Sequence, residues 1–136
     1  MAKSIPKVQK YMTTAPISTD RQETIASAHQ RMREHGIRHL PVVEGDRLVG
    51  IVSQGDLHLI ETLPDVDAET VTVDDAMTPN PYTVSPDAAL HEVVAEMAEH
   101  KYGSALVTQN GKVVGVFTTV DAMRALAELL QGRLSK

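Results

Sequence analysis

The sequence predicts an α/β protein of the α+β type, in which two pseudo-symmetric β-α-β-β-α repeats pack sheet to sheet. Two observations lead to this prediction. The chain matches itself when it is shifted by 65 residues, and each copy shows the same order of helix and strand patterns. Because an internal repeat defines the architecture of the chain that contains it, we expect the two copies to share one fold.

The internal repeat runs without a gap. Eleven of the 49 positions from residue 8 to residue 56 are identical to the residue 65 places later. Ordinary residue frequencies give about three such identities by chance. The matching pairs begin with Val8 and Val73 and end with Asp56 and Asp121. The two copies are therefore expected to place equivalent residues at equivalent points of the fold.

The repeat also sets the expected domain boundaries. The first copy covers residues 1–62, a linker with Pro64 and several acids covers residues 63–70, and the second copy covers residues 71–136. One such copy is too small to bury its sheet well. Stacking two copies sheet to sheet solves this problem and predicts a single two-part module.

Each copy opens with a short helical turn and a proline-containing extended segment, and an amphipathic helix follows. In the second copy, Ser85-Pro86-Asp87 predicts the start of that helix, with serine as the N-cap and proline at the first helical position. In the first copy, Gly36 lies just past the apolar pattern and predicts the end of the helix.

Two strands joined by a tight turn follow each helix. The predicted strands are residues 39–43, 48–53, 104–108 and 112–118. Asn110-Gly111 between the last two is one of the strongest short hairpin signals. A last helix begins after each second strand. The final one is predicted from about residue 119 to residue 130, with Gly132 ending it.

Composition excludes several classes of protein. The chain has 136 residues, of which 42% are hydrophobic, and it contains no cysteine, so disulfides and thiolate chemistry are excluded. No apolar run approaches the roughly 20 residues of a membrane helix, and the first residues lack the pattern of a signal peptide. We therefore expect a cytoplasmic protein. The net charge of −5 argues against nucleic-acid binding.

The most informative motif lies where each second strand becomes the last helix. Both copies read glycine, two apolar residues, a hydroxyl (Ser53 or Thr118), any two residues, and an aspartate (Asp56 or Asp121). A carboxylate at this position can accept two hydrogen bonds from the vicinal diol of a ribose, and the helix N-terminus favours an anionic ligand. The alternative is that these residues only cap their helices.

With this motif, the sequence resembles the cystathionine-β-synthase (CBS) domain family, and the pair resembles a stand-alone Bateman module. The lead-in at residues 8–16 and the segment Gly-Ile-Arg-His-Leu-Pro-Val-Val at residues 36–43 support the resemblance. It implies that Asp56 and Asp121 bind ribose hydroxyls. It also implies phosphate contacts from Ser53, Thr118, Arg38, His39 and Lys101, and an adenine lined by Ile17, Ile51 and Val116.

The two implied sites are not equivalent. Arg38 and His39 correspond to the uncharged Gly103 and Ser104 in the second copy, where the nearby Lys101 is a candidate substitute. Because the stacked copies would share one cleft, the basic pair could serve a phosphate at either site. Which site is occupied stays open.

The favoured function is a regulatory module that senses an adenine nucleotide or adenosyl compound in the cleft between its repeats and signals to a protein effector by conformational change. Candidate ligands are ATP, ADP, AMP, S-adenosylmethionine and NAD, with no obligatory cofactor, and a homodimer is expected. The alternative is an interaction scaffold whose nucleotide sites do not bind.

We expect no enzymatic activity and no metal site. No nucleophile, acid–base pair or metal-ligand set stands out in the sequence. His35 and His39 have helical metal-ligand spacing, but Gly36 is expected to end the helix between them.

Overall fold

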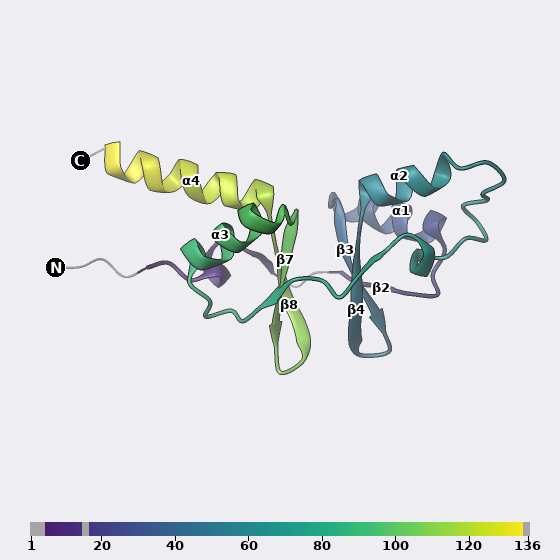
Figure 1. Cartoon of the computed structure of the whole chain (residues 1–136), viewed down its shortest axis with the longest axis horizontal. Coiled ribbons are helices and arrows are strands. Elements are labelled where there is room, and N and C mark those ends of the chain that lie inside the picture. Colours follow the sequence, from purple (N-terminus) through teal and green to yellow (C-terminus); the bar gives the residue numbers. More distant parts are fainter. Residues whose placement is uncertain (1–4, 15–16, 135–136) are drawn as a thin grey trace. The chain divides into compact units, whose positions relative to one another are not determined.

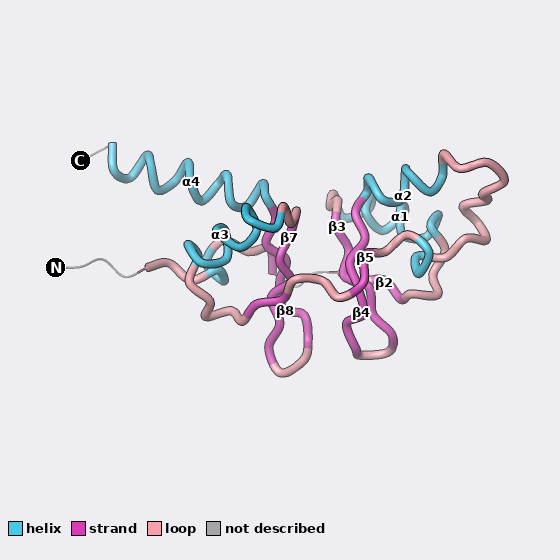
Figure 2. The backbone as a smooth tube through the Cα atoms, in the orientation of Figure 1, coloured by secondary structure: helices cyan, strands magenta, loops and turns pink. Residues whose placement is uncertain are grey.

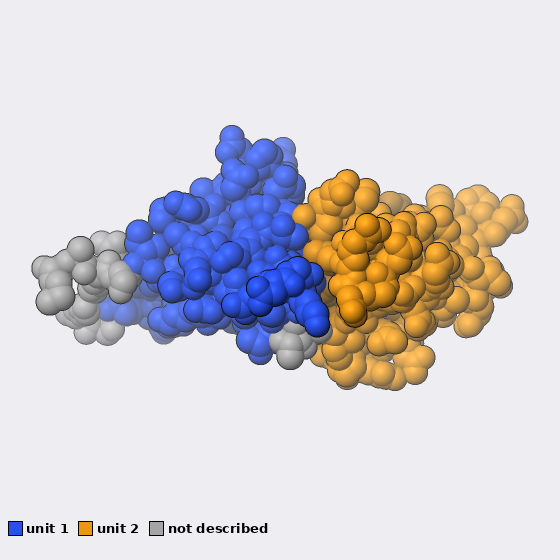
Figure 3. Space-filling model, turned by 90° about the horizontal axis from the view of Figure 1, so that it is seen from below, with its two compact units in different colours: residues 1–15, 82–136 blue, residues 16–81 orange. Residues whose placement is uncertain are grey.

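The computed structural model describes residues 5–14 and 17–134. The chain forms two compact units, which Figure 3 distinguishes by colour. Unit 1 consists of Met1–Ala15 and Tyr82–Lys136, and unit 2 is Pro16–Pro81. The units do not coincide with the two sequence copies. The start of the first copy belongs to unit 1, together with the helices of the second copy. The lead-in of the second copy, residues 73–81, belongs to unit 2, together with the helices of the first copy.

Unit 2 holds a four-stranded sheet in the order β2-β3-β4-β5. Its elements are β2 Thr19–Asp20, α1 Ile25–His35, β3 His39–Glu44, β4 Arg47–Ser53, α2 Gln54–Glu61, the 3-10 turn Val73–Asp75 and β5 Thr78–Pro79. β2 runs parallel to β3, and the other neighbours are antiparallel. Both helices cover the same face of this sheet (Figure 1). Between them lies an aliphatic core of Ile25, Ala28, Met32, Leu40, Val42, Val52, Leu57 and Val73.

Unit 1 repeats this plan in the order β1-β8-β7-β6. Its elements are the 3-10 turn Val8–Lys10, β1 Thr13–Thr14, β6 Thr83–Val84, α3 Leu90–His100, β7 Ser104–Gln109, β8 Lys112–Thr118 and α4 Thr119–Leu134. Figure 2 shows the short hairpin loop between β7 and β8, where Asn110 and Gly111 both have positive φ. The predicted α/β class and the β-α-β-β-α order of each repeat are therefore confirmed.

An ion pair fixes the lead-in of the second copy to unit 2. Nη2 and Nε of Arg21 lie 2.6 Å and 2.8 Å from Oδ1 of Asp74. This hydrogen bond with Asp74 raises the pKa of Arg21 above its usual value. The backbone adds to the attachment, since the N–H of Val73 donates to the carbonyl of Glu23 at 2.8 Å.

The end of α1 follows the prediction. Gly36 adopts the left-handed conformation with φ of 62°, and its N–H donates to the carbonyls of Met32 and Arg33. Lys101 occupies the equivalent place after α3 with φ of 60°. A residue with a side chain is strained in this conformation, so the second repeat ends its helix less favourably.

Two predicted helix ends were wrong. α3 begins at Leu90, five residues after Ser85, whose Oγ instead accepts the N–H of Asp87 in a tight turn. The carbonyl of Pro86 accepts the N–H of Gln9, so this turn is held by the lead-in of the other copy. At the other end, α4 continues through Gly132 to Leu134, because one glycine weakens a helix without having to end it.

Among the described residues, no helix is both long enough and apolar enough to cross a membrane.

Candidate functional site

The first predicted site lies where β4 becomes α2 in unit 2. The Oγ of Ser53 accepts the N–H of Asp56 at 3.1 Å, and Oδ2 of Asp56 accepts the N–H of Ser53 at 2.9 Å. These two bonds form a capping box, which satisfies donors that the helix itself leaves without partners. Within the described part of the chain, Oδ1 of Asp56 accepts no hydrogen bond, so this oxygen can accept one from a ligand.

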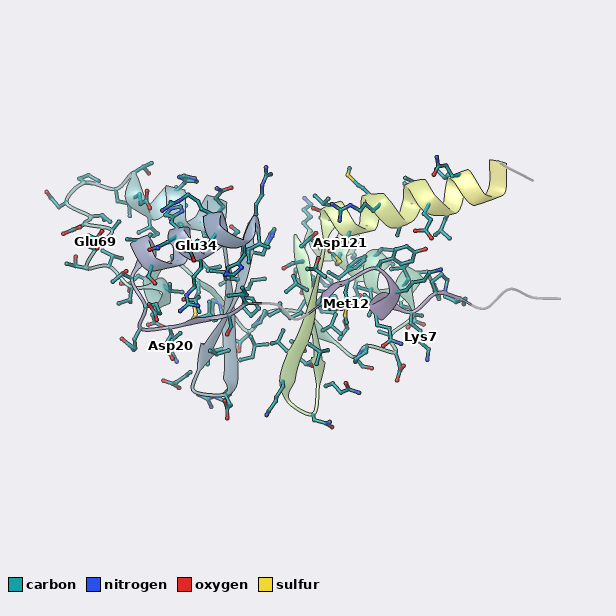
Figure 4. The ribbon with its side chains drawn as sticks, turned by 180° about the vertical axis from the view of Figure 1, so that it is seen from behind. Lys7, Met12, Asp20, Glu34, Glu69 and Asp121 are labelled. Carbon is teal, nitrogen blue, oxygen red and sulfur yellow. The ribbon has the colours of Figure 1, made fainter. Side chains whose placement is uncertain are left out.

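The equivalent junction in unit 1 lies between β8 and α4, and Figure 4 shows Asp121 there. Oδ2 of Asp121 accepts the N–H of Thr118 at 2.9 Å, and the N–H of Asp121 donates to Oγ1 of Thr118 at 3.3 Å. Asp121 is only 4% exposed. Its second oxygen, Oδ1, accepts a bond from Nη1 of Arg124 at 3.3 Å, although the Arg124 side chain is largely exposed. The two carboxylates therefore differ at their second oxygen. Arg124 donates to Oδ1 of Asp121, whereas none of the described residues donates to Oδ1 of Asp56.

The predicted phosphate residues of the first copy lie at the same end of the sheet as Ser53. His39 is paired directly with Ser53 across β3 and β4. The carbonyl of Arg38 accepts the N–H of Gln54, the first residue of α2, at 2.8 Å. The structure thus brings the backbone of Arg38 and His39 next to the start of α2, and the Arg38 residue is exposed to solvent.

The second repeat has the same backbone arrangement with fewer charges. Ser104 pairs with Thr118, and the carbonyl of Gly103 accepts the N–H of Thr119 at 3.2 Å. Lys101 is exposed and lies two residues before Gly103. That the Lys101 side chain supplies the positive charge for a phosphate in this repeat therefore stays a prediction.

The predicted base-lining residues lie in different environments. Ile51 and Val116 occupy equivalent places in β4 and β8, opposite Pro41 and Leu106 on the neighbouring strands. Both lie outside the helix-covered cores, and Val116 is only 6% exposed. Ile17, in contrast, packs against the core of unit 2.

Sequence reasoning missed an apolar pocket of about 390 Å³ in unit 1. Its lining residues are Val94, Met97, Ala98, Lys101, Tyr102, Gly103, Thr119 and Ala122. The pocket lies beside the Thr118 junction, because Thr119 begins α4. The repeat alignment contained a signal for this pocket. Ala122 stands where the first copy has the larger and fully buried Leu57, so the second copy has less side-chain volume at this place.

Comparison with known protein families gives two matches, one over residues 8–59 and one over residues 73–128, both to the CBS domain. Together they cover most of the chain. The chain belongs to the CBS domain family. The resemblance that the sequence motifs indicated is therefore confirmed, and each repeat of the chain is one CBS domain.

Relatives of this CBS pair include larger proteins. Inosine-5'-monophosphate dehydrogenase of Korarchaeum cryptofilum is 32% identical over 122 residues, which are 89% of this chain but only 24% of the dehydrogenase. The chain thus spans about a quarter of that relative.

Solved structures match the CBS pair over nearly their full length. A Vibrio cholerae protein named for acetoin utilization (AcuB) superimposes with a TM-score of 0.82 at 30% identity, covering 98% of both chains. The CBS domain pair of protein MJ0100, solved with methylthioadenosine and S-adenosyl-L-methionine, has a TM-score of 0.82 at 26% identity and covers 92% of this chain and 98% of its own.

Proposed function

We propose that this CBS pair is a regulatory module that binds an adenine nucleotide or adenosyl compound at the strand-to-helix junctions of its repeats. Asp56 and Asp121 accept hydrogen bonds from the ribose, and the hydroxyls of Ser53 and Thr118 face the phosphates. Arg38, His39 and Lys101 supply positive charge to an anionic ligand, and Ile17, Ile51 and Val116 contact the base. Binding changes the conformation of the module, and a protein effector recognises that change.

The carboxylate of Asp56 carries this proposal. One of its oxygens is used by the capping box, while Oδ1 accepts no bond from the described residues. A capping role needs only one oxygen, so the second oxygen is available for a hydroxyl donor. The likeness to the MJ0100 pair, which was solved with two adenosyl compounds, supports the same ligand class.

Ligand-induced stabilisation is the direct test. A ligand at 100 times its dissociation constant stabilises the fold by about 2.7 kcal/mol, which corresponds to several degrees in a protein of this size. We expect at least one of ATP, ADP, AMP, NAD and S-adenosylmethionine to raise the unfolding temperature in a thermal-shift assay. The corresponding guanine nucleotides, GTP and GMP, should have a smaller effect.

A flat response to all five compounds would favour the alternative function, an interaction scaffold with non-binding sites. That alternative has one observation in its favour, the exposed apolar surface of α4. Among the α4 side chains that the structure describes, the large apolar ones with more than 40% exposure are Val120, Met123, Leu126, Leu129 and Leu130. Such a surface on one helix is typical of a protein interface.

We propose that α4 contacts α4 of a second copy in a homodimer, which is compatible with either function. Leu126→Lys should weaken this dimer by about 100-fold or more, because an unpaired charge would be buried in the interface. Glu128→Gln changes the net charge by the same amount on the same helix and should leave the dimer intact. Light scattering after gel filtration measures the effect, and a wild-type chain that is monomeric at every concentration would contradict the dimer.

A further inference from the structure

Two histidines and one glutamate meet between α1 and α2 in unit 2. His29 comes from α1, while His58 and Glu61 are three residues apart on α2 and so lie on one side of that helix. The potential ligand atoms of these three side chains all lie within 4.8 Å of one another. The ring centroids of His29 and His58 are 4.9 Å apart. We call this group the histidine–glutamate cluster.

The buried Nε2 of His29 forms no hydrogen bond with any residue that the structure describes. His29 is only 9% exposed, and buried ring nitrogens normally find a partner. Oε1 of Glu61 approaches Nε2 to 2.6 Å, but without the direction of an N–H···O hydrogen bond. A ring nitrogen directs its proton or its lone pair along the same axis, so the lone pair of Nε2 also points beside this oxygen. A metal ion bound by Nε2 of His29 and Oε1 of Glu61 would lie along the direction of this lone pair.

The repeat shows that the fold itself does not need these residues. The positions equivalent to His29, His58 and Glu61 in the second repeat are Val94, Met123 and Leu126. The same pair of helices therefore forms with three apolar side chains at these places. The histidine–glutamate cluster is a property of the first repeat alone and calls for an explanation other than packing.

We propose that His29, His58 and Glu61 bind a zinc(II) ion. Two imidazole nitrogens and one carboxylate oxygen are a typical zinc ligand set that leaves a fourth position for water. Calcium and magnesium, in contrast, prefer oxygen ligands alone. His58 and Glu61 are exposed, which gives an ion access from solvent, while the buried His29 anchors the site.

Zinc binding requires limited side-chain movements, because the ligand atoms of the cluster lie within 4.8 Å of one another and have to close by at most about 1.5 Å. Bonds of about 2.0–2.1 Å in a tetrahedral site place ligand atoms roughly 3.3 Å apart. Oε1 of Glu61 must therefore withdraw from its 2.6 Å contact with Nε2 of His29 by less than about 1 Å. Glu61 is the last residue of α2, and its side chain is one-third exposed, so it has room to turn. The bound ion joins α1 to the C-terminal end of α2.

Zinc titration of the metal-free chain tests the site. After treatment with a chelator, isothermal titration calorimetry with zinc chloride should give one equivalent of zinc per chain. Cobalt(II) should give the visible absorption of a four-coordinate site without any thiolate band, since the chain has no cysteine. Magnesium should give no saturable binding. No nucleotide is present, so the result is independent of the proposed function.

Variants at the two exposed ligands provide the decisive comparison. His58→Gln and Glu61→Gln should each weaken zinc binding by more than about tenfold. His100→Gln is the matched control, because His100 lies in a second, fully exposed group with Glu96 and Glu99. That control should keep the full equivalent. Unchanged binding in both cluster variants, loss of binding in His100→Gln, or no saturable zinc binding in the wild-type chain would overturn the proposal.

Discussion

We expect Asp56→Asn to weaken the binding of the most stabilising adenosyl ligand by about 10–150-fold, and Asp121→Asn to do the same if the second repeat holds the ligand. The lost interaction is a hydrogen bond to a charged acceptor, which is worth roughly 1.5–3 kcal/mol. Asparagine keeps a side-chain carbonyl that can still accept the N–H of Ser53 or Thr118. The capping interaction is therefore retained, and the effect on ligand affinity is separated from an effect on folding.

The ribose itself is tested by comparing each ligand with its 2′-deoxy analogue in isothermal titration calorimetry. The wild-type chain should discriminate against the analogue, and Asp56→Asn should discriminate much less, because the partner of the missing hydroxyl is gone. Equal discrimination in the wild-type chain and in both aspartate variants would show that neither carboxylate binds the sugar.

Asp67→Asn is the matched control for these variants. Oδ1 of Asp67 accepts the N–H of Glu69 at 2.9 Å, so this carboxylate also holds a nearby backbone donor, two residues away. It lies in the segment between the repeats, outside both junctions. Asp67→Asn should therefore change neither the affinity nor the discrimination against the deoxy analogue.

The parts of the fold that were predicted correctly depend on local signals. The hairpin at Asn110-Gly111 needs only two residues that tolerate positive φ, and both have it. Gly36 likewise ends α1 through its own backbone conformation. The capping motif at Ser53 and Asp56 also lies within four residues, so the sequence was sufficient to place the candidate ribose site at the start of a helix.

The features that sequence reasoning missed depend on residues far apart in the chain. The start of α3 is displaced to Leu90 because the N–H of that residue donates to the carbonyl of Pro6, more than 80 residues earlier. The histidine–glutamate cluster joins α1 to α2 across about 30 residues, and no short motif contains its members. Both features become visible only when the packing of distant segments is known.

The glycine that opens the junction motif in each repeat has a packing role. A Cβ added at Gly50 would lie 2.6 Å from Sδ of Met77 and 2.8 Å from the carbonyl oxygen of Thr78. At Gly115 it would collide with Sδ of Met12 and lie 3.0 Å from the carbonyl oxygen of Thr13. The short strands β5 and β1 can pair with β4 and β8 at this distance only because these positions lack a side chain.

Gly50→Ala and Gly115→Ala should each lower the free energy of unfolding by about 1–3 kcal/mol, as overpacking does elsewhere. Met12→Ala should restore much of the loss in Gly115→Ala, because the carbonyl oxygen of Thr13 lies 3.0 Å away and only atoms of the methionine come closer than that. Met77→Ala should restore less in Gly50→Ala, because the carbonyl of Thr78 is a backbone group that cannot turn away.

Urea unfolding of the single and double variants gives these coupling energies directly. Gly103→Ala is the control, since an added Cβ there meets no atom within 4 Å. Gly50 and Gly115 variants that unfold at the same urea concentration as Gly103→Ala would show that neither glycine is required for close strand pairing. We expect Met12→Ala to restore more stability than Met77→Ala. That difference would show that the backbone carbonyl of Thr78 is the reason why the first repeat requires glycine at position 50.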